Sequence, residues 1–231
     1  MAGHVVLAGG AEFGGRMADV DHAAMQLAGG ENAPIRVIPT AAAPDNNHQR
    51  AGQNAVRWFR SLGARDVVSL PLIDAASAND AQIADELRAA RLIYMLGGFT
   101  HYLGQTLKNS ASWAATLAAY EAGAVVAGSS AGAMVLCEWY YNPERAEPVA
   151  GLGMVANACV LPHHNSFGQR WAPALIKRLP AVTLVGIDER TGVILAQTGA
   201  GWAGRCYGQG AITIYRDGAV TASMAGAEVA L

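Results

Sequence analysis

Short runs of apolar residues alternate with longer amphipathic segments through the first 135 residues of the chain. Each run is short, carries β-branched or other apolar side chains and ends near Gly or Pro, a pattern that is typical of strands buried on both faces. The runs are His4–Leu7, Arg36–Pro39, Val67–Leu70, Arg91–Leu96 and Ala124–Ala127. The pattern therefore predicts five buried strands in this part of the chain.

The segments between these runs have the spacing of amphipathic helices. Apolar residues recur on one stripe in Gln49–Ser61 and again in Leu103–Tyr120. A third segment, Asn79–Ala90, begins with a residue type that commonly caps helices. Strands that alternate with helices predict right-handed βαβ units, and hence a mostly parallel sheet with helices on both faces.

The pattern changes beyond residue 140. Val182–Ile187 still has the composition of a central strand, whereas Val193–Gln197, Ala211–Tyr215 and Ala219–Ser223 are short and close together. Asp217-Gly218 separates two of these runs and is a strong hairpin signal. We therefore expect an α/β fold whose C-terminal quarter adds antiparallel strands at one edge of the sheet.

Length and composition favour one globular domain over residues 1–231. The chain is 52% hydrophobic and 15% charged, with a net charge of −2, so neither disorder nor a nucleic-acid partner is expected. It has no apolar run of the roughly 18 residues that a membrane helix needs, and its start lacks the basic region of a signal peptide. Three widely spaced cysteines, Cys137, Cys159 and Cys206, suit free thiols in the cytoplasm.

The most informative segment is Gly128-Ser129-Ser130-Ala131-Gly132, which follows a predicted strand and precedes a small-residue helix. This context fits the G-x-S-x-G nucleophile elbow, with Ser130 at the apex and the Ala131 N–H available to an oxyanion. The alternative is a tight Gly/Ser/Ala turn at an ordinary βα junction. A second oxyanion donor is expected from Gly98 in the Gly97-Gly98 pair, which ends a neighbouring strand.

A serine nucleophile needs a base, and the base needs an orienting carboxylate. Of the six histidines, only His163 and His164 follow Ser130 in the chain. Neighbouring side chains on an extended chain point to opposite sides, so at most one of these two can meet the serine. The pair Asp188-Glu189 follows a buried-looking strand and offers two carboxylates. Glu144 and Glu147 are rival candidates for the acid.

Several segments together resemble the dipeptidase E and cyanophycinase family of serine peptidases, which is related in fold to class I glutamine amidotransferases. The segments are Leu7-Ala8-Gly9-Gly10, Val37-Ile38-Pro39-Thr40-Ala41, Leu96-Gly97-Gly98, Gly128-Ser129-Ser130-Ala131-Gly132-Ala133, His163-His164 and Gly186-Ile187-Asp188-Glu189. The resemblance implies that Ser130 is the nucleophile, His164 the base and Glu189 the acid. It also implies that the N–H groups of Gly98 and Ala131 bind the oxyanion.

The chain departs from this family before the base, where cyanophycinases usually carry Asp-Gln and this sequence has Pro162-His163. Cyanophycin is therefore not the expected substrate. The family favours an aspartyl residue at the scissile bond, and His163, Arg170 or Arg205 could contact such a substrate. A homodimer is left open by the resemblance.

The sequence thus predicts a serine peptidase that cleaves small acidic or β-aspartyl peptides without a cofactor. An esterase or amidase with the same triad and a non-catalytic protein of this fold are the alternatives. Glutaminase chemistry is disfavoured because the apex residue is Ser130 and not cysteine. A metal site is also not expected, because adjacent His163 and His164 with Cys159 lack the usual ligand spacing.

Overall fold

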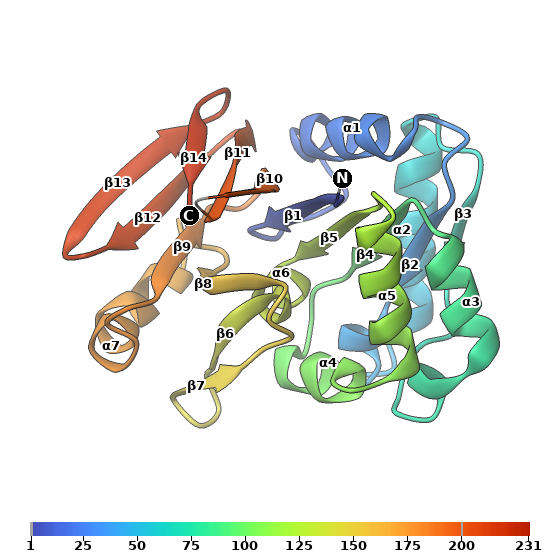
Figure 1. The fold of residues 1–231 in the computed structure, drawn as a ribbon, viewed down its shortest axis with the longest axis horizontal. Coiled ribbons are helices and arrows are strands. Elements are labelled where there is room, and N and C mark those ends of the chain that lie inside the picture. The colour runs from blue at the N-terminus through green and yellow to red at the C-terminus, as the bar shows by residue number, and fades with distance from the viewer. Residues whose placement is uncertain (1, 200) are drawn as a thin grey trace.

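The computed structural model describes residues 2–199 and 201–231, and these residues form two β-sheets (Figure 1). The larger sheet has the strand order β14-β11-β10-β1-β5-β4-β2-β3 and the smaller sheet the order β13-β12-β9-β8-β6-β7. In the larger sheet β1, β5, β4, β2 and β3 are parallel neighbours, and β10, β11 and β14 continue it in antiparallel fashion. This arrangement confirms the predicted α/β class with antiparallel C-terminal strands.

The strands of the larger sheet are β1 (His4–Ala8), β2 (Ile35–Ile38), β3 (Val67–Ser69), β4 (Leu92–Met95), β5 (Val125–Ser129), β10 (Thr191–Thr198), β11 (Gly201–Gly208) and β14 (Glu228–Ala230). Those of the smaller sheet are β6 (Cys137–Asn142), β7 (Glu147–Ala150), β8 (Val155–Leu161), β9 (Thr183–Ile187), β12 (Ala211–Arg216) and β13 (Ala219–Met224). The α-helices are α1 (Met17–Ala28), α2 (His48–Ser61), α3 (Ala81–Ala89), α4 (Thr100–Leu107), α5 (Ala111–Glu121), α6 (Ala131–Leu136) and α7 (Ala172–Arg178).

The smaller sheet is the main feature that the hydrophobic pattern did not predict. Strand β9, which has the composition of a central strand, lies in this sheet between β8 and β12 and not in the larger one. Its residues are buried on both faces, so the apolar pattern reports their burial correctly. That pattern carries no information about which sheet buries them. The Asp217-Gly218 hairpin is confirmed, because β12 pairs with β13 across these two residues, both with positive φ.

Two of the predicted helices differ in their ends. The helix predicted from Asn79 begins after Asp80 instead, whose Oδ1 accepts hydrogen bonds from the N–H groups of Gln82 and Ile83. The single helix predicted over Leu103–Tyr120 is broken in two, because the Ser110 Oγ accepts from the Trp113 N–H and starts α5. Side-chain capping, and not a change in apolar spacing, sets both boundaries.

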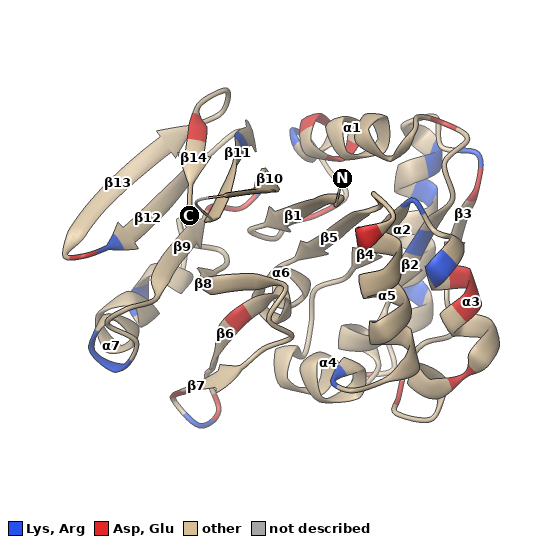
Figure 2. Cartoon of the chain, viewed as in Figure 1, with Lys and Arg blue, Asp and Glu red and all other residues tan. Residues whose placement is uncertain are grey.

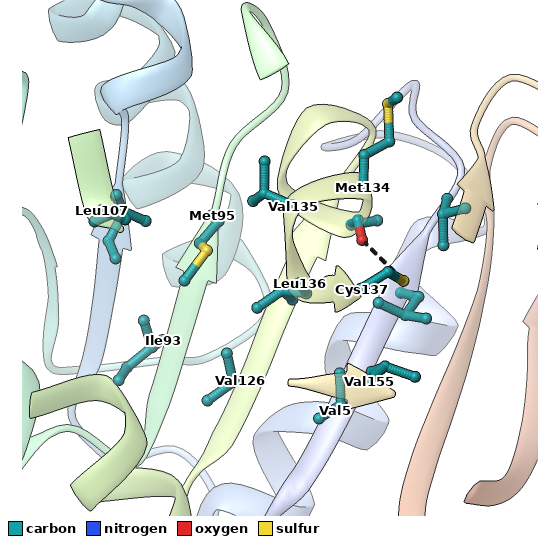
Figure 3. Close-up of a cluster of buried hydrophobic side chains, with 14 of the residues drawn as sticks. Val5, Ile93, Met95, Leu107, Val126, Met134, Val135, Leu136, Cys137 and Val155 are labelled. Carbon is teal, nitrogen blue, oxygen red and sulfur yellow. Dashed lines mark hydrogen bonds between the residues drawn. The ribbon is translucent and has the colours of Figure 1, made fainter. Parts of the chain in front are cut away.

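Alternate residues of the parallel strands point into two different cores. One core includes Val6 and Val37 with residues of α1 and α2, and the other includes Val5 and Ile38 with residues of α3, α5 and α6. Figure 3 shows part of the second core, in which side chains of the larger sheet meet α6 and Val155 of β8. The second core therefore joins the two sheets.

Charged residues are concentrated on helices and loops around these cores. Figure 2 shows arginines along α2 and both acids and an arginine on α3, whereas β4, β5 and β8 carry no charged residue. In the described part of the chain, no helix combines the length and the apolar character that crossing a membrane would require.

Asp21 of α1 is an exception to this distribution, because its side chain is buried. Its Oδ2 accepts a 2.7 Å hydrogen bond from Trp58 Nε1, and burial raises the pKa of its carboxyl group to about 7. The pKa of Asp21 in the folded chain thus lies above its unfolded value of about 3.9. The unfolded chain therefore loses this proton more readily, and the free energy of unfolding falls as the pH rises from about 4 to 7.

We therefore expect Asp21→Asn to raise the free energy of unfolding at pH 8 by roughly 1–4 kcal/mol more than at pH 5. Urea unfolding at both pH values measures the difference. The matched control is Asp19→Asn, which removes an exposed carboxylate of the same helix and should show little pH dependence. An equal gain at both pH values for Asp21→Asn would contradict the account.

Candidate active site

Ser130 occupies a sharp turn between β5 and α6. Its backbone angles, φ 49° and ψ −108°, lie outside the regions that L-residues ordinarily adopt. Its N–H donates to the Ala8 carbonyl at 2.9 Å. Gly128 and Gly132 allow the strand and the helix to meet, since a Cβ on Gly128 would lie 2.3 Å from the carbonyl carbon of Gly132. The serine side chain is therefore lifted from the carboxyl end of a central strand.

His163 lies against this serine. Its Nε2 is 3.1 Å from Ser130 Oγ, and its Nδ1 is 2.8 Å from Glu189 Oε1. The ring stacks on Phe167, with a centroid separation of 4.9 Å and an interplanar angle of 22°. Serine, imidazole and carboxylate thus form one continuous chain of hydrogen bonds.

The expectation that His164 meets Ser130 is wrong. His164 Nε2 lies 2.8 Å from the Tyr215 hydroxyl, and its Nδ1 lies 3.6 Å from Asp188 Oδ1. The two rings do diverge, but the chain is not extended here, because His163 has a φ of 47°. The alternation of side chains therefore could not identify which histidine points toward the serine.

Two glycines accommodate the two histidine rings. A Cβ on Gly10 would lie 2.3 Å from His163 Cε1, and a Cβ on Gly186 would lie 2.4 Å from His164 Cδ2. His163, which the sequence suggested only as a substrate contact, is thus held by the loop that follows β1. His164 is packed against β9 and belongs to the core of the smaller sheet.

Glu189 is the carboxylate that contacts His163. It follows β9, and its N–H donates to Asn165 Oδ1 at 3.1 Å, which fixes the turn that carries it. The rival acids Glu144 and Glu147 lie on the β6–β7 hairpin instead, where a Glu147 oxygen is 3.9 Å from Arg145 Nη1. The structure therefore brings Glu189, and neither rival, to the imidazole.

The Gly97-Gly98 turn runs beside the nucleophile elbow. A Cβ on Gly97 would lie 3.4 Å from Ser130 Cβ. Gly98 has a φ of 137°, and a Cβ there would lie 2.3 Å from the Ala41 carbonyl oxygen, which also accepts from the Phe99 N–H at 2.8 Å. The turn thus lies beside Ser130 and packs closely on the backbone of Ala41.

A cavity of about 350 Å³ opens next to this turn. It lies between α4 and the β6–β7 hairpin, and Gly98, Phe99, His101, Gln105 and Glu144 are among its lining residues. Phe99 is 46% exposed, which is high for so large an apolar side chain. The space beside the Gly97-Gly98 turn is thus lined by both polar and aromatic groups.

The two arginines that the sequence suggested as substrate contacts lie in different parts of the structure. Arg205 does not reach the site, because its Nε donates to the Gly226 carbonyl and it lines a cavity with His4 at the amino-terminal end of β1. Arg170 is exposed and lies three residues after Phe167, in the short helical turn that follows His163. The sequence reasoning overlooked Arg190, whose N–H donates to the Gly10 carbonyl at 2.9 Å.

Glu12 is a further acidic residue near the site that sequence reasoning missed. Its Oε2 accepts from Ser129 Oγ at 2.8 Å, and its Oε1 accepts from the Gly97 N–H at 3.4 Å. The only signal in the sequence is its position just after the Gly9-Gly10 pair, which does not distinguish a functional side chain from an ordinary loop residue.

The three thiols are poorly suited to nucleophilic chemistry. Cys137, Cys159 and Cys206 are free and buried, and burial raises the pKa of Cys159 to about 12 and that of Cys206 to about 11. Such thiols remain protonated at neutral pH. Among the residues that the structure describes, no group of three or more His, Cys, Asp or Glu side chains is arranged to hold a metal ion.

An α/β sheet whose strand ends bring a strained serine, an imidazole and a carboxylate into one hydrogen-bonded chain has the geometry of a serine hydrolase. Comparison with known families agrees with this class. The model of peptidase family S51 matches residues 5–201, and the chain belongs to this family of serine-type hydrolases. Membership of a peptidase family implies peptide substrates.

Two relatives named cyanophycinase, from Synechococcus elongatus and from Thermosynechococcus vestitus, are each 29% identical over 223 residues. Each match covers 92% of this chain and 67% of the relative. A peptidase from an acI-B1 Actinobacterium has a crystal structure similar to this one, with a TM-score of 0.88, 28% identity and coverage of 100% of this chain and 98% of that one. A putative peptidase E from Listeria monocytogenes EGD-e shares the fold, with a TM-score of 0.61, 17% identity and coverage of 97% and 99%.

The surroundings of His164 lead to a prediction about stability. Its side chain is 10% exposed, and burial lowers its pKa below 6.5 despite the nearby Asp188 carboxylate. The neutral ring is therefore the form that the fold favours, and its contribution to stability is present above pH 6.5 and is lost as the pH falls below that value.

As the pH falls from 6.5 to 5, the free energy of unfolding should decrease less in His164→Gln than in the wild type. The variant should also be less stable at pH 8, by about 1 kcal/mol or more, because the contact with the Tyr215 hydroxyl changes. Chemical denaturation across this pH range tests both effects. His22→Gln, which alters an exposed histidine, is the control, and an unchanged pH dependence in His164→Gln would refute the explanation.

Proposed function

We propose that this protein hydrolyses small acidic or β-aspartyl peptides, with Ser130 as nucleophile, His163 as general base and acid, and Glu189 as the group that orients the imidazole. The observation that carries the proposal is the continuous contact from Ser130 Oγ to His163 Nε2 at 3.1 Å and from His163 Nδ1 to Glu189 Oε1 at 2.8 Å. Membership of a serine peptidase family supports it independently.

In the proposed reaction, Ser130 Oγ attacks the peptide carbonyl carbon and its proton passes to His163 Nε2. The carbonyl oxygen becomes an oxyanion, which accepts hydrogen bonds from the N–H groups of Gly98 and Ala131. The C–N bond then breaks as His163 returns the proton to the leaving amine, which yields an acyl-enzyme. Water attacks the acyl group by the same route in reverse and regenerates the serine.

Glu189 stabilises the imidazolium that forms in both steps and fixes the tautomer whose Nε2 can accept a proton. Its side chain is 40% exposed, whereas that of His163 is 20% exposed. The carboxylate is therefore partly solvated and stays available as an acceptor for the ring N–H.

An acidic substrate group needs a cation near the scissile bond. Arg170 and Arg190 flank the His163–Glu189 pair, one in the turn after Phe167 and the other directly after the acid. The resemblance to the dipeptidase E and cyanophycinase family implies aspartyl peptides as the first class to test. We propose Arg190 and Arg170 as the contacts for a substrate carboxylate, and not Arg205, which lies away from the site.

Ser130→Ala and His163→Gln are expected to abolish reaction with a fluorophosphonate probe and to lower peptide hydrolysis by about a thousandfold or more. His164→Gln should still react, because the His164 ring of the wild type contacts Tyr215 and not the serine. Gel fluorescence and intact mass measure the labelling. If His164→Gln lost labelling while His163→Gln kept it, the assignment of the base would be reversed.

Glu189→Gln is expected to lower kcat by at least about a hundredfold, because an amide no longer stabilises the imidazolium. Glu147→Gln, which alters an acid on the β6–β7 hairpin, provides the matched control and should leave kcat unchanged. Steady-state kinetics on the best substrate of the wild type decide the matter. Equal rates for Glu189→Gln and the wild type would exclude Glu189 as the orienting acid.

The substrate class is tested with β-aspartyl dipeptides, N-terminal aspartyl dipeptides, matched neutral dipeptides and p-nitrophenyl esters. We expect the aspartyl peptides to give the highest kcat/KM, and Arg190→Gln to raise their KM about tenfold with a smaller effect on the neutral peptides. Preferential hydrolysis of esters or of neutral peptides would contradict the proposed specificity and favour the alternative of an esterase or amidase.

A further inference from the structure

The end of β1 and the loop that follows it make backbone contacts with three segments of the proposed catalytic apparatus. The Ala8 carbonyl accepts from the Ser130 N–H at 2.9 Å, and the Gly9 carbonyl accepts from the His163 N–H at 2.7 Å. The Gly10 carbonyl accepts from the N–H of Arg190, the residue after the proposed acid. This segment therefore borders the serine, the histidine and the turn that carries the acid.

Within this loop Glu12 connects two segments that carry the proposed oxyanion donors. Its Oε1 accepts from the Gly97 N–H at 3.4 Å, one residue before Gly98. Its Oε2 accepts from Ser129 Oγ at 2.8 Å, one residue before Ser130. One carboxylate thus holds the end of β4 and the end of β5 together from the same side.

The position of Glu12 is itself well determined by packing. The next residue, Phe13, has its ring centroid 5.8 Å from that of Tyr94, 6.4 Å from that of Phe59 and 6.5 Å from that of Trp58. Phe13 has a positive φ of 64°, so the backbone turns back at this point and sends the aromatic ring inward. The loop is thereby anchored on β4 and α2, and Glu12 is presented to the strand ends.

Glu12 is half-buried, and its carboxylate contacts the chain neighbours of the reacting residues. Ser129 is fully buried, and a Cβ on Gly97 would lie 3.2 Å from Glu12 Oε1 and 3.4 Å from Ser130 Cβ. The Glu12 carboxylate thus lies beside the Gly97-Gly98 turn and next to the elbow that carries Ser130. It acts on the reaction through the backbone that it holds.

We propose that Glu12 is a positioning residue that sets the separation between the two oxyanion donors, the N–H groups of Gly98 and Ala131. This inference rests on the proposed function, because it presumes that the two N–H groups stabilise an oxyanion. Both N–H donors must lie about 2.7–3.1 Å from the oxyanion of the tetrahedral intermediate. A shift of either strand end therefore lowers the reaction rate without removing a reacting group.

The rate of fluorophosphonate labelling tests the proposal, because phosphonylation of a serine needs the same oxyanion site. We expect Glu12→Ala to lower the second-order labelling rate constant by about tenfold to a hundredfold. The final stoichiometry of labelling should stay at that of the wild type, because the nucleophile and base are intact. The midpoint of the pH–rate profile should also stay unchanged, since His163 keeps its contact with Glu189.

Glu12→Gln and Ser129→Ala sharpen the test and guard against misfolding of Glu12→Ala. The amide of Glu12→Gln can still accept one of the two hydrogen bonds, so its rate should fall between those of the wild type and Glu12→Ala. Ser129→Ala removes one contact, and because Ser129 acts through Glu12, the double variant should be no slower than Glu12→Ala alone. Glu31→Ala, which changes an exposed acid in a loop after α1, is the control.

The outcomes separate this inference from the proposed function. A Ser130→Ala variant that still labels would reject the nucleophile itself. If Ser130→Ala is inert but Glu12→Ala and Glu12→Gln label within about twofold of the wild-type rate, the role of Glu12 is overturned and the triad stands. A fall in labelling stoichiometry with an unchanged rate constant would mean that Glu12 serves only folding, which also overturns the proposal.

Discussion

The close contact between β5 and α6 is the constraint on which the rest of the site depends. Gly128 and Gly132 meet at a distance that admits no side chain, and this contact forces Ser130 into a conformation with positive φ. Strain of this kind persists only where the surrounding structure imposes it. Here the imposed conformation places a hydroxyl and the N–H of Ala131 at the carboxyl end of β5, beside the Gly97-Gly98 turn that follows β4.

The site is completed by the smaller sheet, which supplies the imidazole and the carboxylate from the ends of β8 and β9. The position of the smaller sheet relative to the serine depends on the core shared by the two sheets and on backbone contacts to the end of β1. Gly9 and Gly10 make this junction close, since a Cβ on Gly9 would lie 2.2 Å from the Asp188 carbonyl oxygen and one on Gly10 would strike His163. The glycine pair after β1 therefore has a specific packing role at the boundary between the sheets.

The sequence predicted much of this arrangement because much of it is local. The buried strands, the G-x-S-x-G turn and the Asp217-Gly218 hairpin each follow from a few neighbouring residues. The choice between His163 and His164 does not, because it depends on one positive φ and on which of Gly10 and Gly186 each ring faces. These contacts join residues far apart in the chain, and no spacing rule reports them.

Contacts between distant parts of the chain also explain why the sequence does not predict Glu12, Arg190 or the smaller sheet. They explain as well why the expectation that Arg205 contacts the substrate is wrong. Arg205 lies in a C-terminal strand that pairs with β10, and only the register of that strand shows that its side chain lies toward the amino-terminal end of β1. The hydrophobic pattern reports burial, whereas the site is defined by register and by which sheet a strand joins.

The crystal structure of the protein after reaction with a fluorophosphonate tests the central claim most directly. The account predicts phosphorus bonded to Ser130 Oγ and its oxygen about 2.7–3.1 Å from the backbone nitrogens of both Gly98 and Ala131. It also predicts that the imidazole beside the adduct is that of His163, with Glu189 behind it. An adduct on another residue, or an oxygen turned away from these two nitrogens, would contradict it.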